Sequence, residues 1–228
     1  MIKAVLFDIG STLIEGPTIS PAKKISQMLA GDFSLKQDIS ALIMTTRINT
    51  PAELASILEK KWGSDKVDIT VLEEIWNEQL NSARVKDGAV EIYQHCRKLG
   101  LTTCFISNIW RPYYLSFAKV CPEVEGDADH RFLSYEMGVQ KPDVEIFKKV
   151  LNELQLKPEE VAIIGDTYDC DIEPAIALGI KTIWFLHRPD NERESIVRIE
   201  NKEAKKADFT VESLDEIASS GILEELLR

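Results

Sequence analysis

Short apolar runs alternate along the chain with longer stretches whose apolar positions recur every three or four residues. The first run, Ala4-Val5-Leu6-Phe7, is typical of a short buried strand. Further runs at 102–106, 161–164, 181–185 and 209–211 are rich in β-branched and aromatic residues. We therefore expect strands at these five places, the last of them at the periphery of a sheet.

A block of about seventy residues after the first strand shows helical periodicity and no convincing strand. Pro21 and Pro51 suit the first turn of a helix. Ser20 and Thr50, which precede them, have the side chains of N-caps. We interpret residues 16–86 as a helical domain inserted early in the chain. Its expected helices are 21–30, 35–45, 51–62 and 71–85.

Beyond residue 86, helix and strand patterns alternate. Helices are expected at 89–99, 143–154 and 171–178. Strands that alternate with helices favour an α/β fold with a parallel, doubly wound sheet. We assign residues 1–15 and 87–228 to this core domain and expect residues 188–207 to form a loop with a short helix.

Composition and charge narrow the class of protein. The 228 residues are 44% apolar and 29% charged, which suits a soluble globular protein. The net charge of −11 argues against a nucleic-acid duplex or an anionic membrane surface as partner. No apolar N-terminal region and no run long enough to span a membrane is evident, so a cytoplasmic protein is expected. Nothing in the pattern indicates the oligomeric state.

The four cysteines show no CxxC pairing: Cys96, Cys104, Cys121 and Cys170. Two of them fall in apolar segments. Free buried thiols in a reducing cytosol are therefore expected in preference to disulfides or a zinc site.

Polar residues follow the expected strands at their carboxyl ends, where ligands bind in such sheets. Asp8 follows the first strand, Ser107 and Asn108 the second, and Asp166 the third. Lys141 opens a later helix. This set of side chains indicates a site for phosphate and Mg²⁺, since a hard cation prefers oxygen ligands. It comprises two carboxylates, a hydroxyl, an amide and an ammonium.

In sequence order, these residues lie in four segments that together resemble the motifs of the haloacid dehalogenase superfamily. The segments are Asp8-Ile9-Gly10-Ser11-Thr12-Leu13, Ile106-Ser107-Asn108, Lys141-Pro142-Asp143 and Gly165-Asp166-Thr167-Tyr168-Asp169-Cys170-Asp171. Each motif alone is weak, but four in order at strand ends are a specific signal. The resemblance spans nearly the whole chain, and the helical insertion looks like that family's cap.

The resemblance implies catalytic roles for three residues. Asp8 would be the nucleophile that forms a covalent aspartyl intermediate. Ser107 would hold oxygens of the transferring group, and Lys141 would neutralise charge on nucleophile and substrate. The substrate would be a small phosphorylated molecule.

The resemblance also implies a Mg²⁺ site and a phosphate-binding turn. Asp8, Asp166 and the backbone carbonyl of Gly10 would hold the metal, supported by Asp171 or, as the second choice, Asp169. Three further residues are expected to belong to the substrate-binding site: Ser11, Thr12 and Asn108. Of these, Thr12 is expected to fix the turn rather than touch the substrate.

Gly10 departs from the phosphatase pattern, which has an acid–base aspartate at this position. Glycine keeps the carbonyl but removes a group whose loss typically costs roughly 10²–10⁴ in rate. Three outcomes stay open. In the first, the enzyme slowly hydrolyses only substrates with good leaving groups. In the second, another residue such as Glu15 or a cap side chain replaces the acid. In the third, the enzyme catalyses a different reaction.

Two alternatives to a Mg²⁺-dependent phosphohydrolase follow from this departure. Dehalogenases of the superfamily also lack that aspartate but need no Mg²⁺, whereas Asp166 argues for a metal. The other alternative is a degenerate member that binds a phosphate compound or a protein with little turnover. The phosphohydrolase is the leading interpretation.

Other polar segments have ordinary structural interpretations. The acidic stretch 123–130 fits no EF-hand spacing and is expected to be a solvated loop. Trp110 and Arg111 either contact substrate or pack at a helix start. Arg47, between two cap helices, is a candidate anion clamp but is more simply a surface residue.

Overall fold

The computed structural model describes residues 1–227 and centres on a parallel sheet. Its strands are β1 (Ala4–Phe7), β4 (Thr102–Ser107), β5 (His130–Leu133), β6 (Val161–Gly165), β7 (Lys181–Phe185) and β8 (Phe209–Val211). They lie in the order β5-β4-β1-β6-β7-β8, and every pairing is parallel. The order runs outward from β1 in both directions, which confirms the predicted doubly wound α/β fold.

Side chains of the central strand alternate between two helical layers. Val5 and Phe7 face one apolar cluster, and Ala4 and Leu6 face another, as expected for the two-residue period of a strand. Helices against the first face are α5 (Ala89–Lys98), α6 (Arg111–Val120), α7 (Pro122–Asp127), α12 (Leu214–Ser219) and α13 (Ile222–Leu226). Those against the second are α9 (Val144–Leu154) and α10 (Glu173–Leu178).

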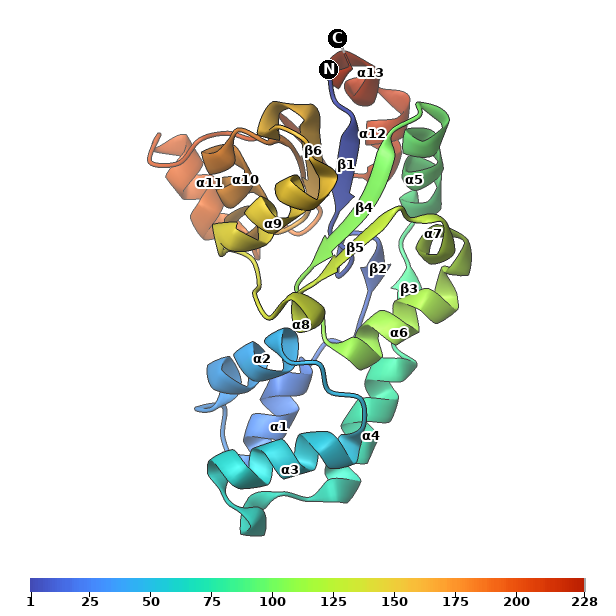
Figure 1. Cartoon of the computed structure of the whole chain (residues 1–228). Coiled ribbons are helices and arrows are strands. Elements are labelled where there is room, and N and C mark those ends of the chain that lie inside the picture. The colour runs from blue at the N-terminus through green and yellow to red at the C-terminus, as the bar shows by residue number, and fades with distance from the viewer. Residues whose placement is uncertain (228) are drawn as a thin grey trace.

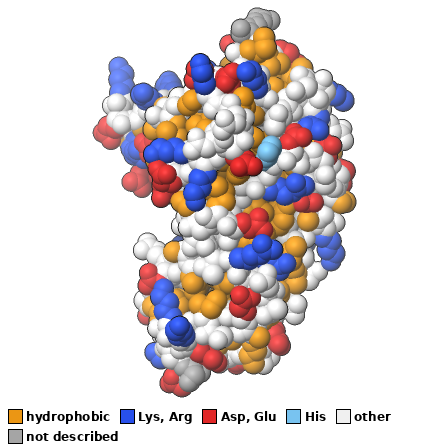
Figure 2. Space-filling model, in the orientation of Figure 1, with side chains coloured by type: hydrophobic (Ala, Val, Ile, Leu, Met, Phe, Trp, Pro, Cys, Tyr) orange, Lys and Arg blue, Asp and Glu red, His pale blue; other side chains and the backbone are white. Residues whose placement is uncertain are grey.

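Four helices form a separate body at one end of the molecule (Figure 1). They are α1 (Pro21–Ala30), α2 (Lys36–Thr45), α3 (Pro51–Trp62) and α4 (Ile69–Leu80). Their apolar faces share a cluster that also includes Trp110 of the sheet region, whose ring meets that of Trp76 edge-on at 5.2 Å. The space-filling view is hollowed on one side where this body meets the sheet region (Figure 2).

The remaining short elements connect this framework. They are the 3-10 turns at Ser64–Lys66 and Pro158–Glu160, α8 (Ser134–Met137), the π-helical turn Tyr168–Ile172 and α11 (Arg193–Glu200). The last is the short helix expected within residues 188–207. A two-stranded antiparallel ribbon of β2 (Ile14–Glu15) and β3 (Arg84–Val85) joins the two ends of the helical segment.

Several predicted boundaries are confirmed by their caps. Ser20 accepts a hydrogen bond from the Lys23 N–H at 3.3 Å, and Thr50 accepts one from the Glu53 N–H at 3.1 Å. Each side chain satisfies a backbone donor that the first helical turn leaves free, which explains why α1 begins at Pro21.

Three sequence predictions are wrong. The helix expected at 71–85 ends at Leu80, and β3 follows it, because its residues pair with β2, far away in the chain. The acidic stretch 123–130 is not a solvated loop: it contains most of α7 and leads into β5, which no sequence pattern revealed. Asp171 does not begin an α-helix but lies in the π-helical turn before α10.

All four cysteines are free thiols, as expected, and Cys170 alone among them is partly exposed. Among the described helices, none combines the length and the apolar character needed to cross a membrane.

Candidate active site

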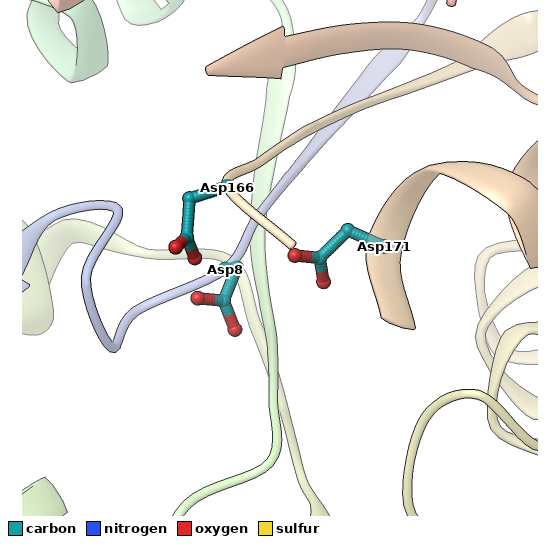
Figure 3. A group of neighbouring side chains, drawn as sticks. All are labelled: Asp8, Asp166 and Asp171. Carbon is teal, nitrogen blue, oxygen red and sulfur yellow. The ribbon is translucent and has the colours of Figure 1, made fainter. Parts of the chain in front are cut away.

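Three aspartates meet at the carboxyl edge of the sheet. Asp8 follows β1, Asp166 follows β6, and Asp171 lies in the next turn of chain. Figure 3 shows their side chains pointing toward one another, and one carboxylate oxygen of each lies within 4.8 Å of the other two. Their exposed fractions are 6%, 5% and 1%, so water screens their mutual repulsion poorly.

The buried ammonium of Lys141 lies between two of these carboxylates. Its Nζ donates to Asp8 Oδ1 at 2.7 Å and to Asp171 Oδ1 at 2.5 Å. A third bond runs to the Ile106 carbonyl at 2.9 Å, so all three ammonium donors are used. Burial alone would lower the pKa of Lys141, but Asp171 and Asp8 outweigh it and raise that pKa, so the group is charged.

The residues at the end of β4 orient this ion-paired group. Ser107 Oγ donates to Asp8 Oδ1 at 3.0 Å. Asn108 bonds the backbone of Lys141 twice, donating to its carbonyl at 2.7 Å and accepting from its N–H at 2.8 Å. The Asn108 amide was expected to contact substrate. In the structure it holds the backbone of Lys141.

Burial and repulsion raise the pKa of two of the three carboxyl groups. Burial, then Asp8 and Asp171, raise the pKa of Asp166 to about 7, although Arg188 opposes the shift. Burial, followed by the charge of Asp8, raises the pKa of Asp171 to about 6 despite the opposing effect of Lys141. The Lys141 ammonium and the Arg188 guanidinium thus do not fully neutralise the negative charge of the three carboxylates.

A divalent cation fits this donor set. All three aspartates offer hard oxygen ligands, which Mg²⁺ prefers. At bonds of about 2.1 Å, two ligands of an octahedral Mg²⁺ lie about 3.0 Å apart when adjacent and about 4.2 Å apart when opposite, so the three oxygens would draw closer together around the ion. The raised pKa values of Asp166 and Asp171 show that the cluster lacks positive charge.

The loop after β7 supplies the other groups at the cluster. The Arg188 guanidinium donates to Asp166 Oδ2, and His187 Nε2 lies 3.9 Å from the same oxygen. Burial, Lys86 and Arg188 lower the pKa of His187 to about 4, so its ring is neutral near pH 7. On the other side, Thr12 Oγ1 lies 3.4 Å from Asp166 Oδ1.

The turn after Asp8 is closed by its own backbone bonds. Ser11 has φ of 65°, and its N–H donates to the Ile14 carbonyl at 2.7 Å. That N–H, one of those expected to hold substrate oxygens, is therefore engaged. Thr12 is fully buried, as suits a residue that fixes the turn, and does not line the adjoining pocket. Gly10 and Ser11 do line it.

The pocket beside this turn has a volume of about 400 Å³. The sheet region and helices α1, α2 and α4 all contribute to its wall. Its lining residues are Gly10, Ser11, Glu15, Gly16, Pro17, Thr18, Ser20, Pro21, Met44, Gln79, Asn108, Ile109, Trp110, Tyr113, His187 and Arg188.

Three other candidates from the sequence have structural partners. Glu15 is 63% exposed and pairs with Lys86 at 2.8 Å, which lowers the pKa of its carboxyl, so Glu15 holds no proton to donate near neutral pH. Asp169 pairs with Arg198 at 2.8 Å, outside the carboxylate cluster. Arg47 lies 3.7 Å from Glu136 and does not line the pocket.

The tryptophan after β4 is a packing residue. Trp110 is fully buried against the helices α1–α4, although it also lines the pocket. This favours helix-start packing over the alternative of a substrate contact. Arg111, its neighbour, begins α6 and does not line the pocket.

Sequence reasoning missed Arg188 and Tyr113, and it gave His187 only a structural role. Arg188 and His187 follow β7, and the strand-end rule that found Asp8 would have found them had it been applied to that strand. Tyr113 had no such signal, because it lies in the first turn of α6 and reaches the pocket through tertiary packing.

Known proteins similar to this chain include two named glyceraldehyde 3-phosphate phosphatase. The one from Pyrococcus abyssi is 26% identical over 200 residues, covering 81% of this chain and 82% of that protein. The one from Pyrococcus furiosus is 41% identical over 63 residues, only 28% of this chain and 26% of that protein. This second match thus spans about a quarter of the relative's length.

Solved structures support the fold. A haloacid dehalogenase family enzyme from Bacteroides thetaiotaomicron, crystallised with magnesium, aligns with a TM-score of 0.61 and 24% identity, covering 79% of this chain and 91% of that one. The L-2-haloacid dehalogenase from Xanthobacter autotrophicus aligns with a TM-score of 0.62 and 17% identity over 98% of this chain and 99% of that one. At such identities the likeness concerns the fold alone.

The family comparison covers most of the sequence. Residues 2–179 match the description "haloacid dehalogenase-like hydrolase". This range contains the three aspartates, Lys141 and the helical segment between β2 and β3. The chain therefore belongs to the family of haloacid dehalogenase-like hydrolases.

Proposed function

We propose that this hydrolase is a Mg²⁺-dependent phosphohydrolase acting on a small phosphorylated molecule, with Asp8 as nucleophile. The observation that carries the proposal is the buried cluster of Asp8, Asp166 and Asp171, which lacks positive charge in spite of Lys141. The alternative, a dehalogenase that works without metal, needs no cation site. The relatives named as phosphatases favour the same conclusion.

The residues around Asp8 suit nucleophilic attack on phosphorus. Lys141 donates a hydrogen bond to Asp8 Oδ1 at 2.7 Å and neutralises charge that the phosphoryl group brings. Ser107 holds one Asp8 oxygen, which fixes the direction of the other. Bound Mg²⁺, held by Asp8, Asp166 and Asp171 with the carbonyl of Gly10, would supply positive charge to the phosphoryl oxygens.

In our proposal, residues 16–86 form a cap domain on a core of residues 1–15 and 87–228. Support comes from the separate apolar cluster of α1–α4 and from the pocket wall that α2 and α4 share with the sheet region. A pocket of about 400 Å³ fits a small metabolite rather than a polymer.

Hydrolysis of p-nitrophenyl phosphate and of acetyl phosphate tests the proposal. Wild-type turnover that requires Mg²⁺ and disappears in Asp8→Asn supports it. A wild type that is silent but gains activity in Gly10→Asp is a degenerate member instead. Halide release from a 2-haloacid without Mg²⁺ shows dehalogenation and contradicts the proposal.

A further inference from the structure

An aromatic side chain from another element borders the space beside Gly10. A Cβ placed on Gly10 would lie 3.7 Å from Cε1 of Tyr113, in ordinary van der Waals contact. Cε1 is two bonds from the tyrosine hydroxyl. The Tyr113 hydroxyl lies more than 4 Å from that Cβ position, on the ring that borders the side of the turn where residue 10 has no side chain.

The backbone of Gly16 packs directly against the same hydroxyl. A Cβ at Gly16 would lie 2.4 Å from the Tyr113 hydroxyl oxygen and 2.7 Å from Cζ, distances that no packed atoms tolerate. The backbone of Gly16 has no left-handed φ that would itself require glycine. The contact with Tyr113 thus explains why position 16 has no side chain.

The hydroxyl is available to a ligand. Tyr113 is partly exposed and lines the pocket together with Gly10, Ser11 and Arg188. Among the residues that the structure describes, no hydrogen-bond partner of its hydroxyl is found. Its neighbour Tyr114, by contrast, donates to Glu125 at 2.6 Å.

On the basis of the proposed phosphohydrolase function, we propose that Tyr113 is the proton donor to the leaving group, in place of a side chain at Gly10. Asp8 forms a bond to phosphorus while the bond from phosphorus to the leaving-group oxygen breaks. The electron pair stays on that oxygen, which takes the Tyr113 proton. Water then gives a proton to the phenolate and attacks phosphorus. The bond from phosphorus to the Asp8 oxygen breaks and its electron pair returns to the carboxylate, which releases phosphate and restores both side chains.

The acidity of a phenol fits this role for one class of substrate. Burial, followed by the charges of Asp8 and Glu15, raises the pKa of Tyr113, so the hydroxyl keeps its proton at neutral pH. A phenol is still a stronger acid than an aliphatic alcohol, so proton transfer to an alkoxide is downhill. Alkyl phosphates need this proton, whereas p-nitrophenyl phosphate releases a stable anion without it.

The test compares benzyl phosphate with p-nitrophenyl phosphate, two aromatic esters that differ in their need for a proton. In Tyr113→Phe, kcat for benzyl phosphate is expected to fall about 10²-fold or more, because general acid catalysis is lost. With p-nitrophenyl phosphate, kcat is expected to stay within about threefold, a factor smaller than general acid catalysis supplies. Gly16→Ala, which displaces the hydroxyl, should show the same selective loss.

Tyr114→Phe is the matched control and should leave the ratio of the two rates unchanged. Equal losses on both esters, no loss in Tyr113→Phe, or a wild type unable to hydrolyse benzyl phosphate would overturn the inference. Mg²⁺-dependent turnover of p-nitrophenyl phosphate separates these results from failure of the proposed function, which would remove that activity in the wild type as well.

Discussion

Lys141 gives the sharpest test of the electrostatic account of the site. Its ammonium is 2% exposed and bonds both Asp8 and Asp171. In Lys141→Met the two carboxylates stay buried without their cation. Breaking a buried ion pair costs about 3–5 kcal/mol, and one ammonium here serves two carboxylates, so we expect the upper end of that range. At 2–4 °C per kcal/mol, Tm should fall by about 10–20 °C.

Urea unfolding and thermal melts in EDTA measure this loss. Lys148→Met is the matched control, since Lys148 is half-exposed on α9 and its partner is Glu145 on the surface. Adding Asp171→Asn to Lys141→Met should recover part of the stability, because one unpaired charge is removed. If Lys141→Met is no less stable than Lys148→Met, the two carboxylates do not depend on this ammonium and the reasoning is refuted.

Three further predictions concern the cluster and the helical body. Arg188→Gln removes the guanidinium that donates to Asp166, so Mg²⁺ should bind about tenfold more tightly, which corresponds to about 1.4 kcal/mol of binding free energy. Titration calorimetry measures this affinity. Unchanged or weaker binding would show that Arg188 does not compete with the cation. The pKa of Asp166 is raised from 3.8 to about 7 in the folded protein, so between these pH values the folded protein binds one proton more than the unfolded chain. Without metal, the free energy of unfolding should therefore fall as pH rises through this window. The loss is on the order of 4 kcal/mol at 1.4 kcal/mol per pH unit, read from urea unfolding at each pH, and a flat profile in EDTA would contradict it. Trp110→Ala should destabilise the packing against Trp76 by about 3–5 kcal/mol in the same assay, whereas a change below about 1 kcal/mol would mean that this contact does not hold the helices in place.

The sheet and its strand ends were predictable because they depend on local patterns. Buried parallel strands are continuous apolar runs, and their carboxyl ends share one edge, so Asp8, Ser107 and Asp166 could be placed together from sequence alone. The caps at Ser20 and Thr50 are local signals of the same kind.

Features that depend on distant partners were not predictable. Arg84–Val85 continues an apolar helical pattern, and only its pairing with Ile14–Glu15 makes it a strand. His130–Leu133 carries a histidine and an arginine at its start, so no apolar run marks this edge strand. The position of Tyr113 against Gly10 depends on how α6 packs.

Covalent labelling of Asp8 tests the central claim most directly. Acetyl phosphate carrying radioactive phosphate is mixed with the protein and Mg²⁺, the reaction is quenched in acid, and the labelled peptide is identified by mass spectrometry. Its leaving group needs no proton, so the result does not depend on Tyr113. We predict an acid-stable, hydroxylamine-sensitive phosphate on the peptide containing Asp8 in the wild type and none in Asp8→Asn. No label in the wild type, or equal label in Asp8→Asn, would contradict the account.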